Sequence, residues 1–470
     1  NSVYLSKHDV NVIYAAFNHH KYGDFKPYIF MSEDKGKSWK SISNNLPERG
    51  SVYSIEEDHQ KEGLIFCGTE FGVFFSPDFG NRWKELSNGL PTISVRDITI
   101  QSRENDLILG TFGRGFYVLD DYSLLRAVEN KEILEPKIFP IRDALMWEKA
   151  SPLGRSGKSF QGDNFYLAEN LDPVALISYN YDNSSESLKS KRQKTESKLI
   201  KDRKDVTYPS YEQLYDETNE ILPQLVFTIK DQKDLVVKKI YRGLSKGVSR
   251  FEWNLRYEEN MPVGKGSSQV SRGTLVNPGK YSIKLSLLDK GILSDLVPEV
   301  YFNVVALDNT VMPAKNREEK VNFQRKVAVL QAEISEYSNK LTEIKNKMPY
   351  VLNAIKKSEK SADFALSDYS NINNKIKEIE KIFLGDSVKS RLDIQAVPTP
   401  STRIGMIGYY QKYSTADPTI THQKSFEIAK EEFMPIKSMI EDLKVMVKKL
   451  EEFLKANNSP YTPGRTKASY

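Results

Sequence analysis

Short apolar stretches alternate with polar residues through the first part of the chain, a pattern typical of β-strands joined by tight turns. Two such stretches end alike: residues 28–39 are YIFMSEDKGKSW and residues 72–83 are GVFFSPDFGNRW. Both finish in Ser-x-Asp-x-Gly-x-x-Trp, they lie 44 residues apart, and each is followed by Leu-Pro. A period of about 40–50 residues with short strands is the signature of β-propeller blades.

A second pair of matching positions supports the same period. Gly68-Thr69 recurs 42 residues later as Gly110-Thr111. The third copy, residues 115–121, keeps the apolar strand but loses the Ser, Gly and Trp, so we expect a closing blade. Three blades do not close a propeller, since about four to eight are typical. We therefore expect the remaining blades to precede Asn1 in a precursor or to come from another chain.

The repeated motif resembles the Asp-box, or BNR, repeat of sialidases, two-propeller xyloglucanases and sortilin-type sorting receptors. Residues 110–121 also resemble the end of the propeller in large secreted bacterial proteins described as sortilin-like or glycosyl hydrolase. The resemblance implies a secreted, periplasmic or cell-surface protein. It also implies that the Asp boxes lie on the rim, away from any catalytic face.

The chemistry of the motif favours a structural role over direct ligand contact. Each Asp can accept hydrogen bonds from turn amides, each Gly supplies a positive φ, and each Trp contributes a large apolar surface. Truncation of either Trp to Ala is therefore predicted to cost about 3–5 kcal/mol. The predicted structural Asp-box residues are Ser32, Asp34, Gly36, Trp39, Ser76, Asp78, Gly80 and Trp83.

The second region, residues 136–308, also predicts short alternating strands broken by Gly, Asn and Pro. RFEWNLR at 250–256 and NPGKYSIKL at 277–285 resemble parts of an immunoglobulin-like or fibronectin-like β-sandwich module. In such a module Trp253 and Tyr281 would be core aromatic residues. The expected strands are residues 174–181, 225–229, 235–241, 248–256, 280–287 and 299–305.

An insertion at 183–205 interrupts this module and is rich in Ser and Lys. Lys189, Lys191, Arg192 and Lys194 lie close together within it. We predict a solvated, mobile loop, because charge runs usually face water. The alternative is a basic contact for an acidic partner or a polysaccharide.

The third region, residues 314–456, predicts helices. Apolar residues recur at steps of three and four between Val327 and Met348, between Ile372 and Phe383, and between Phe433 and Leu454. Pro349 is expected to stop the first helix. We predict an antiparallel helical hairpin or three-helix bundle whose stripes form its own core rather than a partner-binding seam. The tail, 457–470, is expected to be a disordered end or a linker.

The composition limits the kinds of partner that we expect for this chain. Of 470 residues 39% are hydrophobic, and 68 basic residues against 63 acidic ones give a net charge of +5. This near balance gives no reason to expect nucleic acid, and the absence of a run of 18 apolar residues predicts no membrane span. Cys67 is the single cysteine and aligns with Leu109 of the next repeat, so it is predicted to be a core residue.

Candidate chemistry is sparse, and we predict no catalytic residue, cofactor or metal site in this chain. The five histidines, at positions 8, 19, 20, 59 and 422, show no zinc-binding spacing. A glycosidase needs two carboxylates flanking a sugar cleft, and a sialidase also needs several arginines and a Tyr–Glu pair. The carboxylates to test are Asp24, Glu70, Asp97, Asp120 and Asp121, and the arginines are Arg49, Arg82, Arg96, Arg103, Arg114 and Arg126.

The sequence therefore predicts a mainly β protein with α-helices: a partial Asp-box β-propeller over 1–128, a β-sandwich, and a helical bundle. We expect non-catalytic binding of a protein or peptide, or scaffolding, in a secreted or cell-envelope assembly. The partner would be a protein, the remaining blades or a glycan. The alternative is a glycoside hydrolase whose catalytic residues lie largely upstream.

Overall fold

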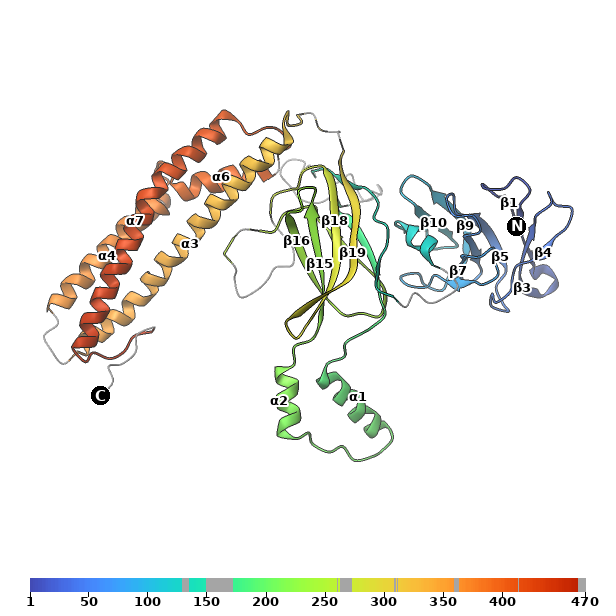
Figure 1. Ribbon diagram of the computed structural model, residues 1–470, viewed down its shortest axis with the longest axis horizontal. Coiled ribbons are helices and arrows are strands. Elements are labelled where there is room, and N and C mark those ends of the chain that lie inside the picture. Colours follow the sequence, from blue (N-terminus) through green and yellow to red (C-terminus); the bar gives the residue numbers. More distant parts are fainter. Residues whose placement is uncertain are drawn as a thin grey trace.

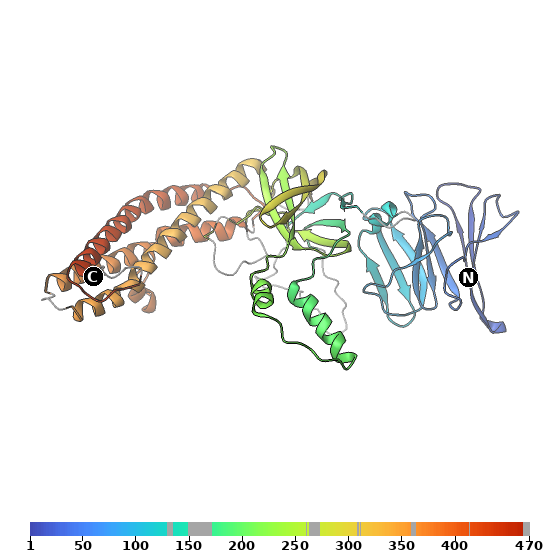
Figure 2. The same ribbon diagram turned by 60° about the horizontal axis from the view of Figure 1, so that its bottom comes forward.

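The computed structural model describes residues 1–128, 135–148, 172–259, 261–262, 273–307, 310, 312–358, 363–412 and 414–463 (Figure 1). The fold combines antiparallel sheets in the N-terminal and central parts with helices in the C-terminal part. This confirms the expected mixture of β and α structure. Figures 1 and 2 show the three parts following one another along the long axis, with the N-terminal sheets at one end.

Three antiparallel sheets form the N-terminal part. In each sheet, strands consecutive in sequence are neighbours in space. The first sheet contains β1 (Ser2–Leu5), β2 (Ile13–His19), β3 (Asp24–Ser32) and β4 (Lys40–Ser41), with the short helix η1 (His20–Tyr22) between β2 and β3. The second contains β5 (Val52–Glu57), β6 (Ile65–Thr69), β7 (Gly72–Ser76) and β8 (Lys84–Glu85). The third contains β9 (Val95–Gln101), β10 (Asp106–Thr111) and β11 (Phe116–Leu119), and η2 (Tyr122–Ala127) follows it.

These sheets stack face to face through two apolar cores. The first core joins the inner face of the first sheet, including Tyr14 and Met31, to Cys67 and Trp83 of the second. Cys67 is fully buried there, and burial raises the pKa of its thiol, which confirms the prediction of a core cysteine. The second core joins the other face of the second sheet to the third sheet and η2.

A buried carboxylate ties η2 back to the second sheet. Tyr122 donates its hydroxyl proton to Asp58, and Arg126 donates from Nε at 2.8 Å and from Nη2 at 2.9 Å. Burial acts to raise the pKa of Asp58, but the hydrogen bonds from Arg126, Tyr122 and the backbone of Lys61 outweigh it and lower that pKa. The helix η2, which follows the third sheet, is thus fixed to the second sheet by an ion pair whose carboxylate is fully buried.

Two sheets form the central part and enclose one core. The first has the order β12 (Lys137–Ile138), β14 (Ala175–Tyr181), β17 (Gly247–Trp253). The second has the order β13 (Ala144–Met146), β19 (Ile292–Ala306), β18 (Gly279–Asp289), β15 (Gln224–Asp231), β16 (Val236–Gly243). All pairings are antiparallel except that of β13 with β19, which is parallel. Trp253 and Tyr281 are buried with ring centroids 5.6 Å apart, as predicted for core aromatics.

The insertion differs from the sequence-based expectation. Instead of a loop, residues 183–205 contain the helix α1 (Leu188–Lys201), and a second helix, α2 (Tyr211–Asn219), follows them before β15. Ser187 caps the start of α1, and Ser210 with Gln213 forms a capping box at the start of α2. These caps satisfy backbone donors that a charge count does not consider, so the loop prediction was wrong.

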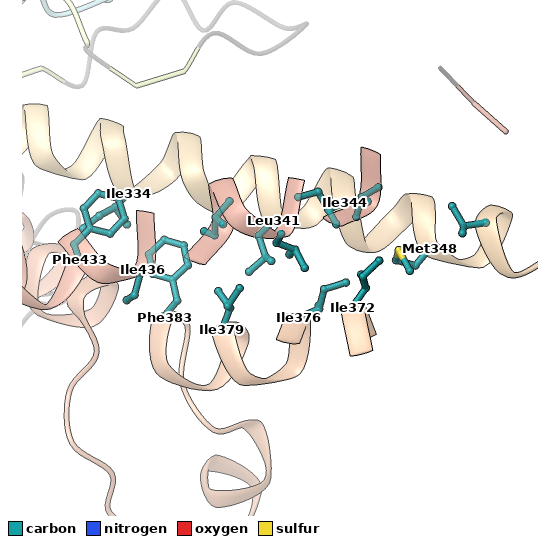
Figure 3. Close-up of a cluster of buried hydrophobic side chains, with 14 of the residues drawn as sticks. Ile334, Leu341, Ile344, Met348, Ile372, Ile376, Ile379, Phe383, Phe433 and Ile436 are labelled. Atoms are coloured by element: carbon teal, nitrogen blue, oxygen red, sulfur yellow. The ribbon is translucent and has the colours of Figure 1, made fainter. Parts of the chain in front are cut away.

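The C-terminal part contains α3 (Arg317–Lys356), α4 (Asp363–Phe383), α5 (Ser387–Arg391), α6 (Pro400–Lys412) and α7 (Ile420–Ala456). Figure 3 shows apolar side chains of α3, α4 and α7 facing one another in a shared core. The predicted stop at Pro349 was wrong, because α3 continues through it to Lys356. Val351 and Ile355 are buried beyond the proline, so packing there offsets the lost backbone hydrogen bond.

The start of the C-terminal tail is also packed. Ser459 and Thr462 are buried, and the hydroxyls of Ser459 and Ser358 are 2.9 Å apart. Residues 457–463 therefore begin by packing against the ends of the helices. Residues 464–470 lie outside the described part of the chain.

Candidate functional site

The first two sheets carry the Ser-x-Asp turns at one end. The turns join β3 to β4 and β7 to β8, and the same hydrogen bonds form in both. In the first, Ser32 Oγ donates to Asp34 Oδ1 at 2.8 Å, and the amide of Gly36 donates to Ser32 Oγ at 2.8 Å. In the second, Ser76 Oγ donates to Asp78 Oδ1 at 2.7 Å, and the amide of Gly80 donates to Ser76 Oγ at 2.9 Å.

Both turns also show the backbone geometry that the motif requires. Gly36 has a φ of 85° and Gly80 a φ of 80°, in the left-handed region that favours glycine. Hydrogen bonds from the side chain and backbone of Ser38 lower the pKa of Asp34 to about 2. These carboxylate contacts are made within the turn itself.

The two motif tryptophans have different surroundings. Trp83 is only 3% exposed, and its Nε1 donates to the carbonyl of Ile42 in the first sheet at 2.8 Å. Asn45, in the loop after β4, accepts from the amide of Trp83 at 2.8 Å and donates to its carbonyl at 2.9 Å. Trp39 is 44% exposed, and its Nε1 donates to Gly36 of its own turn at 3.1 Å. The difference reflects position: Trp83 lies between two sheets, and Trp39 lies on the open side of the first.

That open side is an apolar sheet surface. Strand pairing aligns Val3 with Ala15 and Ala15 with Phe30, while Leu5 pairs with Ile13. Val3 is 71% exposed, Leu5 66% and Phe17 49%, and the rings of Phe17 and Phe30 meet edge to face at 6.0 Å. We call this surface the outer face; its members are Val3, Leu5, Ile13, Phe17, Phe30 and Trp39.

The opposite end of the second and third sheets brings three polar side chains together. Tyr53 lies in β5, Glu70 in the turn between β6 and β7, and Arg96 in β9. The hydroxyl of Tyr53 donates to Glu70, and Arg96 Nη2 lies 3.8 Å from Glu70 Oε1. The Arg96 guanidinium also lies 3.7 Å from the centre of the Tyr53 ring. We call these residues the Tyr53 cluster.

The Tyr53 cluster is partly open to solvent. The side chains of Arg96 and Glu70 are 41% and 36% exposed. Burial, with the hydrogen bond to Glu70, raises the pKa of Tyr53. Phe71 and Phe112, in equivalent turns after the repeated Gly-Thr, are exposed nearby, and the Phe112 ring lies 5.1 Å from the Arg96 guanidinium. The repeated Gly-Thr was the signal in the sequence that could have located this end of the sheets.

The other predicted carboxylates serve local structure. Asp24 accepts from the Tyr28 hydroxyl at 2.5 Å, and Asp97 accepts from the next backbone amide at 3.0 Å. Asp121 caps η2, and burial raises the pKa of Asp120. The guanidinium of Arg250, from the central part, donates to the backbone carbonyls of both residues at 2.7 Å. Of the five carboxylates tested, Glu70 is the one paired with both a tyrosine and an arginine.

No arginine set or metal site forms in the described residues. Arg126 binds Asp58, Arg103 pairs with Glu104 at 2.9 Å, and only Arg96 lies in the Tyr53 cluster. No group of three or more His, Cys, Asp or Glu side chains that could hold a metal ion occurs there. His19 stacks on Tyr22, with ring centroids 4.4 Å apart.

A cavity of about 480 Å³ lies where the central sheets meet α3 and α6, and the sequence did not indicate it. Arg256 Nη2 lies 3.5 Å from Glu148 Oε1 in its wall. Burial raises the pKa of Glu148 and lowers that of Lys320, another wall residue. The wall of the cavity thus carries both acidic and basic side chains.

No protein family and no curated protein matches the chain. Among solved structures, the extracellular domain of a hybrid two-component system from B. thetaiotaomicron matches at 11% identity over 65% of this chain and 30% of its own, with a TM-score of 0.20. An ancestral GH74 enzyme matches at 11% identity over 67% of this chain and 36% of its own, with a TM-score of 0.22. The chain thus spans about a third of the length of these structures. At these TM-scores neither likeness assigns a fold or an activity.

Among the helices described, none combines the length and the apolar character needed to cross a membrane.

Proposed function

We propose that this chain is a non-catalytic binding or scaffolding component of a secreted or cell-envelope assembly. Its first part would be the last blades of an Asp-box propeller, followed by an immunoglobulin-like or fibronectin-like sandwich and a helical bundle. The observation that carries the proposal is the outer face, an exposed apolar sheet surface. Large exposed apolar patches on proteins mark interaction sites.

The contact between the first two sheets indicates what the outer face binds. There, the Ser-x-Asp turn of the second sheet packs Trp83 against the first sheet, and Asn44 donates to the carbonyl of Gly80 at 2.8 Å. The first sheet presents the same turn, with Gly36 and Trp39 in the equivalent positions, on its open side. The proposed partner is therefore another β-sheet of this repeat, from the same polypeptide or from another chain.

A photo-crosslinking experiment tests this proposal. In the full chain, Phe17 is replaced with p-benzoylphenylalanine, and Tyr301, an exposed residue of β19, is replaced in a matched control. Irradiation of the native envelope or secreted fraction should give a crosslinked product from position 17 but not from position 301. Peptides joined to position 17 should derive from a protein region carrying Ser-x-Asp-x-Gly-x-x-Trp. Equal crosslinking from both positions, or none from position 17, would contradict the proposal.

The Tyr53 cluster favours a second candidate, a glycoside hydrolase. A tyrosine bonded to a carboxylate beside an arginine is the kind of group that the sialidase alternative requires, although one arginine is present rather than a set. In that case Glu70→Gln and Tyr53→Phe should each lower turnover by orders of magnitude in a glycan-hydrolysis panel. Asp24→Asn is the matched control, since Asp24 binds its own turn. A panel without turnover by the unmodified protein would remove this candidate.

A further inference from the structure

The segment that carries α1 and α2 projects from the central sheets as a separate arm (Figures 1 and 2). Neither α1 nor α2 has a buried residue. The two helices are held together by Arg192, whose Nε lies 2.6 Å from Glu217 Oε1 and whose Nη2 lies 2.9 Å from Glu217 Oε2. The amide of Leu188 also donates to Glu220 at 2.8 Å. The arm is therefore an ordered structure with its other surfaces open.

Four lysines share one side of α1. Their spacings of three, four and three residues place them on the same helical face. Arg192 and Glu196 lie on a different side, and Arg192 turns that side toward α2. We call the set the lysine face: Lys191, Lys194, Lys198 and Lys201.

The lysine face has little to neutralise it. All four side chains are exposed, and only Lys194 forms an ion pair with a described residue, Glu186 at 2.6 Å. Beyond the end of the helix, Arg203 and Lys204 are balanced by Asp202 and Asp205, so the unbalanced charge is confined to α1. Like charges three and four residues apart destabilise a helix. Lys198 and Lys201 lie in the last turn, where the helix dipole favours positive charge, but the dipole does not account for Lys191 and Lys194.

The lysine face also differs from a membrane-inserting surface. The exposed apolar residue Ile200 lies two residues from Lys198 and one from Lys201, which places it on the opposite side of the helix. A helix that enters the membrane interface needs a continuous apolar face. The surface is suited to charge pairing in water.

We infer that the lysine face binds a linear acidic polysaccharide with about one carboxylate or sulfate per sugar residue. At a rise of about 1.5 Å per residue, successive lysines are separated by about 4.5–6 Å along the helix, which is close to the length of one sugar ring. One row of charges complements a chain better than the flat surface of a lipid bilayer. This inference stands independently of the sheet contact proposed above.

Nucleic acid is the less suitable polyanion. A protein that binds DNA strongly through its backbone can contact about 6–10 phosphates, more than the four lysines of this row. Single-stranded nucleic acid also stacks its bases on aromatic side chains, and α1 contains none.

The test measures binding of the full chain to immobilised polygalacturonate, which carries one carboxylate per sugar residue, at low ionic strength. One variant combines Lys191→Gln, Lys194→Gln, Lys198→Gln and Lys201→Gln. A second variant carries Arg at the same four positions and so retains the charge. The matched control makes four Lys→Gln changes at exposed positions of α7: Lys424, Lys430, Lys449 and Lys455.

The glutamine variant should bind about tenfold more weakly or worse, since four exposed charge pairs are lost. The arginine variant and the α7 control should bind as the unmodified protein does, fully methyl-esterified pectin should not bind, and added salt should weaken binding. Undiminished binding by the glutamine variant, an equal loss in the α7 control, or no binding by the unmodified protein would overturn the inference. Tighter binding to single-stranded DNA or to anionic vesicles would overturn the choice of polysaccharide.

Discussion

Truncating the two motif tryptophans should have unequal effects. In Trp83→Ala, a ring that is 3% exposed is removed from the core between the first and second sheets. Truncation of a buried aromatic costs about 3–5 kcal/mol, and loss of its hydrogen bond to Ile42 adds about 1 kcal/mol. In Trp39→Ala the ring is already 44% exposed, and its hydrogen bond is within its own turn, so we expect roughly 1–2 kcal/mol.

Hydrogen exchange measured by mass spectrometry is the suitable assay. A chain with several packed parts does not unfold in a single transition, whereas exchange reports the opening of each part separately. We expect peptides covering β6 and β7 to lose protection in Trp83→Ala. A difference of about 2 kcal/mol between the variants corresponds to roughly 30-fold in exchange rate. Exchange in β14 and β17 should not change in either variant and serves as the internal control.

The comparison can refute the reasoning directly. If Trp39→Ala destabilises the first sheet as much as Trp83→Ala destabilises the second, then Trp39 is buried in solution by a surface outside the described chain. When the proposed partner sheet is added, Trp39 should become buried and Trp39→Ala should then be as destabilising as Trp83→Ala. Equal effects in the isolated chain would contradict the exposed position of Trp39.

Three other predictions address the same region. The Asp34 carboxyl should titrate near pH 2 by NMR, and Ser38→Ala should move its pKa toward the ordinary value of about 3.9. Because the pKa is lowered in the folded state, the contribution of this carboxyl to stability is present above about pH 4 and is lost as the pH falls through 2. Gly80→Ala should lower exchange protection more than Gly89→Ala, by at least about 1 kcal/mol. Both glycines have a φ of 80°, but an added Cβ at Gly80 would lie 2.8 Å from the Ile42 side chain, whereas one at Gly89 would meet open space. Arg250→Lys should raise hydrogen exchange in η2 by about tenfold, because lysine cannot bind two carbonyls with a planar fork.

Local patterns in the sequence accounted for much of the secondary structure. Apolar residues spaced three and four positions apart identified the long helices, since one face of a helix must be buried. Alternation and glycine placement identified the strands and turns, and the hydrogen bonds of both Ser-x-Asp turns join residues within four positions of one another. The caps at Ser187 and Ser210 were also encoded in the sequence, but the prediction of a loop was based on the run of lysines and did not consider them.

The candidate site depended on contacts between distant residues. The sequence named Glu70 and Arg96 among many carboxylates and arginines, but only the pairing of β5 with β6 and the packing of β9 beside them bring both residues to Tyr53. Glu70 and Arg96 lie 17 and 43 positions from Tyr53 along the chain, too far for a local periodicity to indicate the contact. Sequence alone therefore supplied the groups but not their association.

Identical motifs acquired different environments for the same reason. The sequence predicts equal burial for Trp39 and Trp83, and the fold buries one and exposes the other. Pro349 was similarly misjudged, because the apolar contacts that sustain α3 beyond it come from other helices. Short-range bonding is encoded within a few residues of the chain, whereas burial depends on which surface packs against a side chain, and that is decided only by the tertiary structure.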